Sequence, residues 1–253
     1  MIRSTPRRGL TSGLACLALL GLLASPAAAQ SVDEIVARHI EARGGAERWQ
    51  ALRSLRMTGR AIAGPGREAL VTREIKRPGR VRTEFTFQGI TGVFAYDGKR
   101  GWQVSPLTGV LEPQALDPGN LQAAIDQADV EGLLVAARKK GATLSLVGRE
   151  PVAGREAYRI RVTPKAGPSQ DQWLDAETYL LVRTEAMREV RGRSVLMETT
   201  YGDHRTVGGL VIPHAIDVGA RDRPGQVRII VETVDINPRI DDGRFKAPAG
   251  TRR

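Results

Sequence analysis

The sequence predicts a mainly β protein in which one large antiparallel sheet carries helices on one of its faces. Three observations lead to this fold class. From residue 55 onward, most segments are short and alternate apolar with polar side chains. Turn sequences rich in Gly, Pro and Asp separate these segments. Helical periodicity is confined to the stretch after residue 30 and to residues 121–140, so about eleven strands share few helices.

Two helices are expected before the first strand. Ser31 and Glu34 stand at capping-box spacing, apolar residues follow at helical intervals, and Gly44-Gly45 can end the helix. A second short helix over residues 46–52 carries Trp49. Residues 106–119 are rich in Pro and Gly, and residues 121–140 then predict one broken helix or two short ones.

The strands are predicted from their period of two. In residues 81–87, Phe85 and Phe87 share one face with Val81, and Arg82 and Glu84 share the other. A hairpin with Asp97-Gly98 in its turn joins residues 92–96 to 101–105. Further strands are expected at residues 143–148, 157–163, 170–174, 179–190, 194–201, 206–213, 215–219 and 226–236. The short polar tail from Asp241 is expected to fray.

The first 29 residues predict a cleavable secretory signal peptide. Three arginines within the first eight residues precede an apolar run of about a dozen residues, which is short for a membrane-spanning helix of about 20. Ala27 and Ala29 form the small-x-small pattern of a cleavage site, so the mature chain is expected to start at Gln30 and to work outside the cytoplasm. The remaining residues, 30–253, are expected to form a single domain.

Cysteine usage and charge narrow the possible functions. Cys16, the only cysteine, lies in the predicted signal, so the mature chain is expected to lack disulfides, iron–sulfur clusters and a cysteine nucleophile. The net charge of +10, less the three signal arginines, leaves +7. The arginines are scattered among acids, which is typical of a solvated surface and could also steer the protein weakly toward anionic lipid head groups. Nucleic acid is not an expected partner.

No compact catalytic or metal-binding constellation stands out, so the sequence predicts neither an enzyme nor a cofactor. No serine lies in a Gly-x-Ser-x-Gly elbow. Histidines and turn-forming aspartates are dispersed along the chain without ligand spacing: His39, His204, His214, Asp97, Asp175 and Asp203.

Four motifs, taken in order, resemble those of the LolA-like bacterial lipoprotein-sorting superfamily. They are Ala42-Arg43-Gly44-Gly45 followed by Trp49; Tyr96-Asp97-Gly98-Lys99-Arg100-Gly101-Trp102; the strand-turn-strand from Trp173 to Arg183; and Tyr201-Gly202-Asp203-His204-Arg205 with Gly208-Gly209 and Pro213. Each motif alone marks a hairpin or a corner. Their order and spacing together carry the resemblance, which covers nearly the whole mature chain.

The resemblance implies an unclosed antiparallel β-barrel of about eleven strands, a half-barrel with helices packed over its concave face. It further implies a monomeric periplasmic carrier that binds the acyl chains of a lipoprotein or other lipid for transport toward the outer membrane. The partners of such a carrier would be donor and acceptor proteins of the cell envelope, and it would contact a membrane surface transiently. The alternative is a periplasmic sensor or scaffold that uses the same fold to bind a partner protein.

The expected lipid site is an apolar cavity between sheet and helices. Large side chains on apolar strand faces are the candidate lining residues: Met57, Phe85, Phe87, Trp102, Tyr158, Ile160 and Trp173. Each of them could instead be an ordinary core residue, because an apolar strand face is first a core face.

Overall fold

The computed structural model describes Met1 and residues 30–137, 140–165, 167–190 and 192–251. The predicted signal peptide and its cleavage site therefore lie outside the described residues, apart from Met1. Within these ranges, no helix is both long and apolar enough to cross a membrane.

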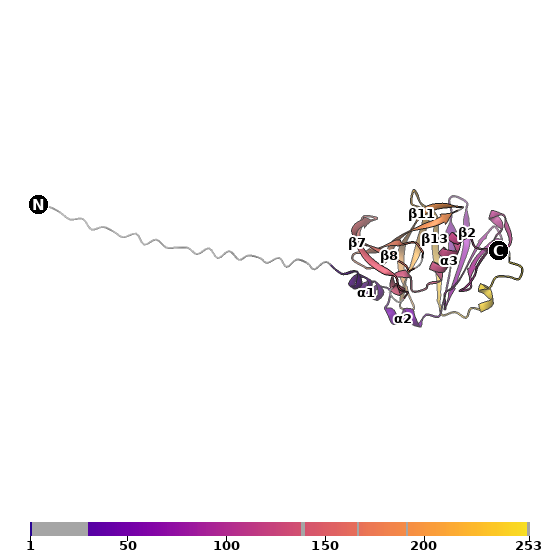
Figure 1. Cartoon of the computed structure of the whole chain (residues 1–253), viewed down its shortest axis with the longest axis horizontal. Helices are drawn as coiled ribbons and strands as arrows, with labels where there is room; N and C mark the ends of the chain where they lie inside the picture. The colour runs from indigo at the N-terminus through magenta and orange to yellow at the C-terminus, as the bar shows by residue number, and fades with distance from the viewer. Residues whose placement is uncertain (2–29, 138–139, 166, 191, 252–253) are drawn as a thin grey trace.

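Thirteen strands form one antiparallel sheet, and the two ends of the sheet do not pair (Figure 1). The order is β6-β5-β4-β3-β2-β1-β13-β12-β11-β10-β9-β8-β7, so two meanders meet where the first and last strands pair. The mainly β, unclosed half-barrel is confirmed. The strands are β1 Ser54–Ile62, β2 Glu68–Lys76, β3 Arg80–Phe87, β4 Ile90–Tyr96, β5 Gly101–Ser105, β6 Val110–Ala115, β7 Thr143–Val152, β8 Arg155–Thr163, β9 Gln170–Asp175, β10 Leu181–Val190, β11 Arg193–Val207, β12 Leu210–Ala220 and β13 Arg223–Ile236.

The strand boundaries depart from the sequence prediction in three places. β6 lies within the Pro- and Gly-rich segment 106–119, where no strand is expected. The Gly208-Gly209 turn separates β11 from β12, as its two glycines predict, but β11 runs without a break from residue 193 to 207, and residues 210–220 form one strand where a break after residue 213 was expected. β13 begins at Arg223, three residues before the expected strand 226–236.

The helices are α1 Val32–Ala42, α2 Ala46–Ala51, α3 Pro118–Ala128 and α4 Leu133–Ala136, with single 3₁₀ turns at η1 Pro106–Thr108 and η2 Asp242–Phe245. The capping box of α1 is present: the Glu34 amide donates to the Ser31 hydroxyl at 3.2 Å, and the Ser31 amide donates to the Glu34 carboxylate at 2.8 Å. The region 121–140 holds two helices, α3 and α4, which is one of the two arrangements predicted from the sequence.

Two apolar clusters attach the helices to the concave face of the sheet. In the first, Ile35 of α1 packs with Tyr158, Ile160 and Leu174 of β8 and β9. The second cluster brings the α2 segment and α3 onto β1, β2 and β12; its buried members include Trp49, Leu52, Leu55, Ile75, Ala124, Ala128 and Leu210. The concave face is therefore covered at two separate places.

A close backbone contact fixes the corner between α1 and α2. The Arg43 carbonyl accepts a hydrogen bond from the Val211 amide at 3.0 Å, so the corner is bonded to β12. Gly44 has φ +105°, and a Cβ there would stand 2.0 Å from the Gly209 carbonyl oxygen. Two motifs far apart in the sequence thus meet at glycines that permit the contact.

The carboxyl tail is packed onto the convex face of the sheet, contrary to the expected fraying. Phe245 is fully buried, and its carbonyl accepts a hydrogen bond from the Trp102 indole N–H at 2.9 Å. Lys76 donates to the Ile240 carbonyl at 2.7 Å and to Asp242 at 2.6 Å. The sequence expectation failed because one apolar residue, Phe245, anchors an otherwise polar segment.

We expect Gly44→Ala to lower the free energy of unfolding by about 3 kcal/mol or more, because a Cβ would meet the Gly209 carbonyl and the backbone would be strained. Urea denaturation of wild type and variant measures this difference.

Gly66→Ala is the matched control, since Gly66 also has a positive φ of +68° but has open space where its Cβ would stand. Gly66→Ala should lower the free energy of unfolding by about 1 kcal/mol, from backbone strain alone. Equal losses in the two variants would show that the corner contact contributes no specific constraint.

Candidate functional site

A cavity of about 440 Å³ lies between the sheet and the helices, bordered by members of both apolar clusters. Its walls come from the α1–α2 corner, from α3 and the segment leading into α4, and from strands on both sides of the β1–β13 pair. Two smaller cavities of about 300 and 190 Å³ share lining residues with it along α3. The gap left between the two clusters is thus a hollow rather than a packed core.

One wall of the cavity is apolar. Met197, Ile216, Val218 and Ile229 contribute adjacent side chains from β11, β12 and β13. The register places them side by side, because Ile216 pairs with both Tyr201 and Ile229, and Val218 pairs with Thr199. Such a surface suits an aliphatic chain.

The helical side of the cavity carries charges that are paired. Asp126 of α3 forms an ion pair with Arg188 of β10, and Asp129 with Lys140 at 2.6 Å. Glu131 forms an ion pair with Arg77. Burial raises the pKa of Asp126, and the neighbouring Arg188 partly opposes this rise. The Asp126–Arg188 pair ties α3 to the sheet at the border between the two larger cavities.

Arg43 lies at the corner and is held by neutral groups. Its guanidinium stands 3.9 Å from the centre of the Trp49 ring and donates to the Glu131 carbonyl at 2.5 Å. Burial lowers the pKa of Arg43 to about 10, with the nearby carboxylates of Asp129 and Glu131 acting in the opposite direction. Arg43 therefore joins α1, α2 and the segment before α4 at one rim of the cavity.

Two histidines line the same rim. His39 is buried, and its Nδ1 donates to the Tyr179 carbonyl at 2.7 Å. Burial, helped by the positive charge of Arg43, lowers the pKa of His39 to about 3. Burial also lowers the pKa of His204. Both rings are neutral at physiological pH and add no positive charge to the cavity.

Arg73 of β2 and Tyr201 of β11 line the cavity from strands on opposite sides of the β1–β13 pair. The Arg73 Nε donates to the Thr83 hydroxyl at 3.4 Å. Burial raises the pKa of Tyr201, so the phenol keeps its proton. This pair places a cation and a hydroxyl beside the apolar wall.

The residues predicted to line a lipid cavity are spread over several environments. Met57 lines the main cavity, and Phe85 lines the smallest one. Tyr158 and Ile160 lie buried beneath α1 in the first apolar cluster. Phe87, on the same strand face as Phe85, is not among the residues that line these three cavities.

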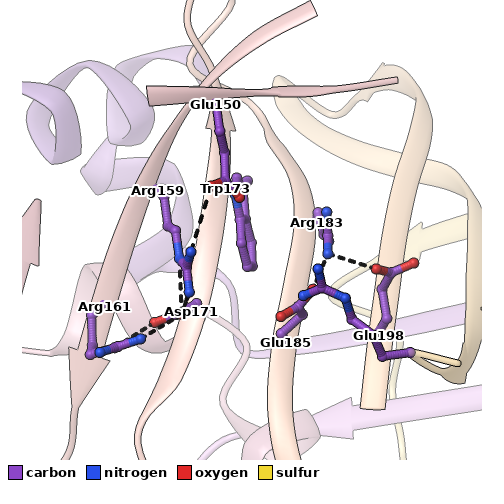
Figure 2. Close-up of polar contacts among 9 residues, drawn as sticks. Glu150, Arg159, Arg161, Asp171, Trp173, Arg183, Glu185 and Glu198 are labelled. Carbon is purple, nitrogen blue, oxygen red and sulfur yellow. Dashed lines mark hydrogen bonds and ion pairs between the residues drawn. The ribbon is translucent and has the colours of Figure 1, made fainter. Parts of the chain in front are cut away.

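The two predicted tryptophans lie on the convex face. Trp173 follows Gln172, a cavity-lining residue of β9, so its side chain points to the other side of the sheet. Figure 2 shows it between Arg159 and Arg183, whose guanidinium carbons stand 5.1 and 4.6 Å from its ring centre. Trp102 lies under Arg82, at 5.6 Å.

The sequence analysis did not single out Arg43, Arg73 or Tyr201 as site residues. Arg43 and Tyr201 stand inside the motifs of the resemblance, so position within a motif was an available signal. Arg73 interrupts the apolar alternation of Val71 and Ile75 on one face of β2, and both of these neighbours are buried. A cation on an apolar strand face is a signal that sequence alone can supply.

The structure is similar to three solved structures at low sequence identity. One is a LolA superfamily protein from Nitrosomonas europaea, with TM-score 0.56 and 15% identity over 86% of this chain and 98% of that one. Another is a candidate outer membrane lipoprotein-sorting protein domain from Vibrio parahaemolyticus, with TM-score 0.54 and 12% identity over 83% and 94%. The third is a DUF1329 family protein from Desulfovibrio piger, with TM-score 0.57 and 13% identity over 86% and 98%.

No family model and no curated protein matches the sequence. The solved structures nevertheless establish that the chain has a LolA-like fold, which confirms the resemblance at the level of the fold.

The free energy of unfolding should decrease as the pH is lowered below about 6.5, because His39 is buried in its neutral form. The unfolded histidine takes up a proton near pH 6.5, whereas the folded one resists protonation down to about 3. The contribution of His39 to the free energy of unfolding is therefore fully present above pH 6.5. It is lost as the pH falls toward 3, by about 1.4 kcal/mol per pH unit for this one group. Urea denaturation between pH 4.5 and 7.5 measures the slope.

In His39→Gln the slope over this range should be shallower, whatever the absolute stability of the variant. Asp126 and His204 also titrate abnormally, but they are present in both proteins and cancel in the comparison. Identical slopes would contradict a neutral, buried His39.

Proposed function

We propose that this protein is a periplasmic carrier that holds the acyl chain of a lipoprotein or another lipid in its main cavity. The observation that carries the proposal is the 440 Å³ cavity with an apolar wall, formed where helices cover an unclosed sheet. The LolA-like fold supports the same function, since one of the similar structures is described as a lipoprotein-sorting domain.

The energetics of the apolar wall suit this role. Each methylene group that leaves water for an apolar surface contributes about 0.8 kcal/mol, so a modest length of aliphatic chain gives useful affinity. The cavity is bordered by Met57 and by the strip Met197, Ile216, Val218 and Ile229. Binding and transfer through such a cavity need no covalent chemistry.

Loading and release require the cover to move, and α3 is the element suited to this. Ala124 and Ala128, together with the partly buried Leu121, form its contact with the second cluster. At its start Gly119 approaches β10 so closely that a Cβ would stand 2.0 Å from the Glu189 carbonyl oxygen. The Asp126–Arg188 pair adds a polar attachment to β10. Because α3 contributes lining residues to all three cavities, its displacement would open each of them. We infer that α3 lifts from β10 when cargo enters.

The predicted signal peptide and the basic charge fit the rest of this proposal. An exported carrier would take its cargo from a donor in the envelope and pass it toward the outer membrane, with brief contact at a membrane surface. The fold is consistent with a single domain acting as a monomer.

Ile216→Trp should abolish lipid binding, because the indole would occupy the part of the cavity over β12 and β13 that the aliphatic chain needs. Native mass spectrometry of protein purified from its own envelope should show a lipid adduct on wild type and none on the variant. Binding of a fluorescent fatty acid should be lost in parallel.

Thr233→Trp is the control, because Thr233 is exposed on β13 and is not among the cavity-lining residues. This variant should retain the adduct. The carrier proposal is wrong if wild type consistently carries no lipid and binds no fluorescent fatty acid.

A further inference from the structure

Within the part of the chain that the structure describes, two cations line the main cavity without an ion pair to a carboxylate, and Arg73 is one of them. The three carboxylates that line the cavity each have a cation: Asp126 with Arg188, Asp129 with Lys140, and Glu131 with Arg77. Arg43, the other cation without a carboxylate, is satisfied by the Trp49 ring and a backbone carbonyl. Among the described cavity-lining cations, Arg73 on β2 is therefore the one whose charge is balanced neither by an ion pair nor by an aromatic ring.

The hydrogen-bonding capacity of Arg73 is mostly unused. A guanidinium has five N–H donors, and the described residues accept one of them, the Nε–H, at the Thr83 hydroxyl. The two terminal nitrogens keep four N–H groups free of protein acceptors. Because Arg73 lines both the main cavity and the 190 Å³ cavity beside it, these groups are available to an occupant.

Burial makes this arrangement unfavourable unless something compensates it. The Arg73 side chain is half-buried, and this burial lowers its pKa. Other arginines that lie against the sheet have carboxylate partners: Arg56 bonds to Glu74 at 3.0 Å, and Arg159 to Asp171 at 2.6 Å. A buried cation without such a partner is normally replaced by an apolar residue or balanced by an anion.

The position of Arg73 relative to the apolar wall suggests what the anion belongs to. Tyr201 is close enough to Arg73 for the two to interact electrostatically, and it carries a second potential donor, its hydroxyl. Ile216 pairs with Tyr201 in the sheet, and Ile229 pairs with Ile216. Arg73 and Tyr201 therefore stand at one end of an aliphatic strip. An amphiphile needs this arrangement, with donors for its head group beside an apolar surface for its tail.

We propose that the cargo is an anionic amphiphile whose carboxylate or phosphate head group pairs with Arg73, while its aliphatic chain lies along Met197, Ile216, Val218 and Ile229. This inference rests on the proposed carrier function and adds the chemical class of the cargo. Guanidinium groups bind such oxyanions through two parallel hydrogen bonds, and the Tyr201 hydroxyl supplies a further donor. The charge of an empty cavity is thereby neutralised when cargo binds.

The test compares ligands that differ in the head group alone. Protein purified from its own envelope and stripped of lipid is titrated calorimetrically with decanoate, decyl phosphate, 1-decanol and decyltrimethylammonium. Wild type should bind both anions more tightly than the alcohol, and the cation most weakly. The tighter of the two anions identifies whether a carboxylate or a phosphate is the natural head group.

Arg73→Met removes the charge and keeps a similar side-chain length. It should weaken the binding of decanoate and decyl phosphate by about 10- to 100-fold, as expected for lost hydrogen bonds to a charged group. Binding of 1-decanol should stay unchanged, and the unliganded variant should melt no lower than wild type. Arg73→Lys should keep part of the affinity for the anions, because it retains the charge but loses the planar pair of donors.

Arg228→Met is the matched control, since Arg228 is exposed, pairs with Asp217 at 2.7 Å and lies outside the cavity. It should change none of the four affinities. If 1-decanol binds wild type as tightly as the anions, and Arg73→Met leaves all affinities unchanged, the head-group assignment is wrong while the carrier function stands. If no ligand binds to folded wild type, both proposals are wrong. Should Arg73→Met fail to fold, the comparison among ligands on wild type, together with Arg73→Lys, decides.

Discussion

The contact between Gly44 and the Gly208-Gly209 turn is the constraint on which the arrangement of this protein depends. A sheet that does not close leaves its concave face exposed, and the helices must cover it. Because the corner between α1 and α2 is bonded to β12 at Val211, α1 is directed onto β8 and β9 while α2 is directed onto β1 and β2. The two helices bury separate clusters, and the space between them stays open as the main cavity.

Local patterns predicted most of the fold. The capping box at Ser31, the Asp97-Gly98 hairpin and the alternating faces of residues 81–87 are all encoded by neighbouring residues, and the structure confirms them. What the sequence missed is nonlocal. β6 forms because it finds an edge at β5, and η2 is ordered because Phe245 reaches Trp102, a contact between residues 143 positions apart. Neither partner is visible from the segment itself.

The candidate site was harder to predict for a related reason. A period of two tells which residues share a strand face, but it does not tell which face is concave or which part of that face a helix covers. Met57 lies where the helices leave a gap, whereas Ile160 lies where α1 fills it. Trp173 belongs to the opposite face, where arginines on both sides of its ring bury it. Large aromatic residues on strands are therefore weak markers of a cavity in this fold.

Charge distribution separates the two faces of the sheet more clearly than hydrophobicity does. On the convex face, arginines form ion pairs with acids of the same or an adjacent strand: Arg159 and Arg161 with Asp171, and Arg183 with Glu185 and Glu198 (Figure 2). Each of these arginines thus has a carboxylate partner within the protein, although the Nε of Arg183 is buried without a hydrogen-bond acceptor. On the concave face, Arg73 has the same chemistry and no acid to complete it. A purely apolar cargo would cover this half-buried guanidinium without pairing it, whereas an anionic head group would neutralise it on loading. The charge of one side chain thus sets a preference among lipids that the apolar wall alone, which accepts any aliphatic chain, does not provide.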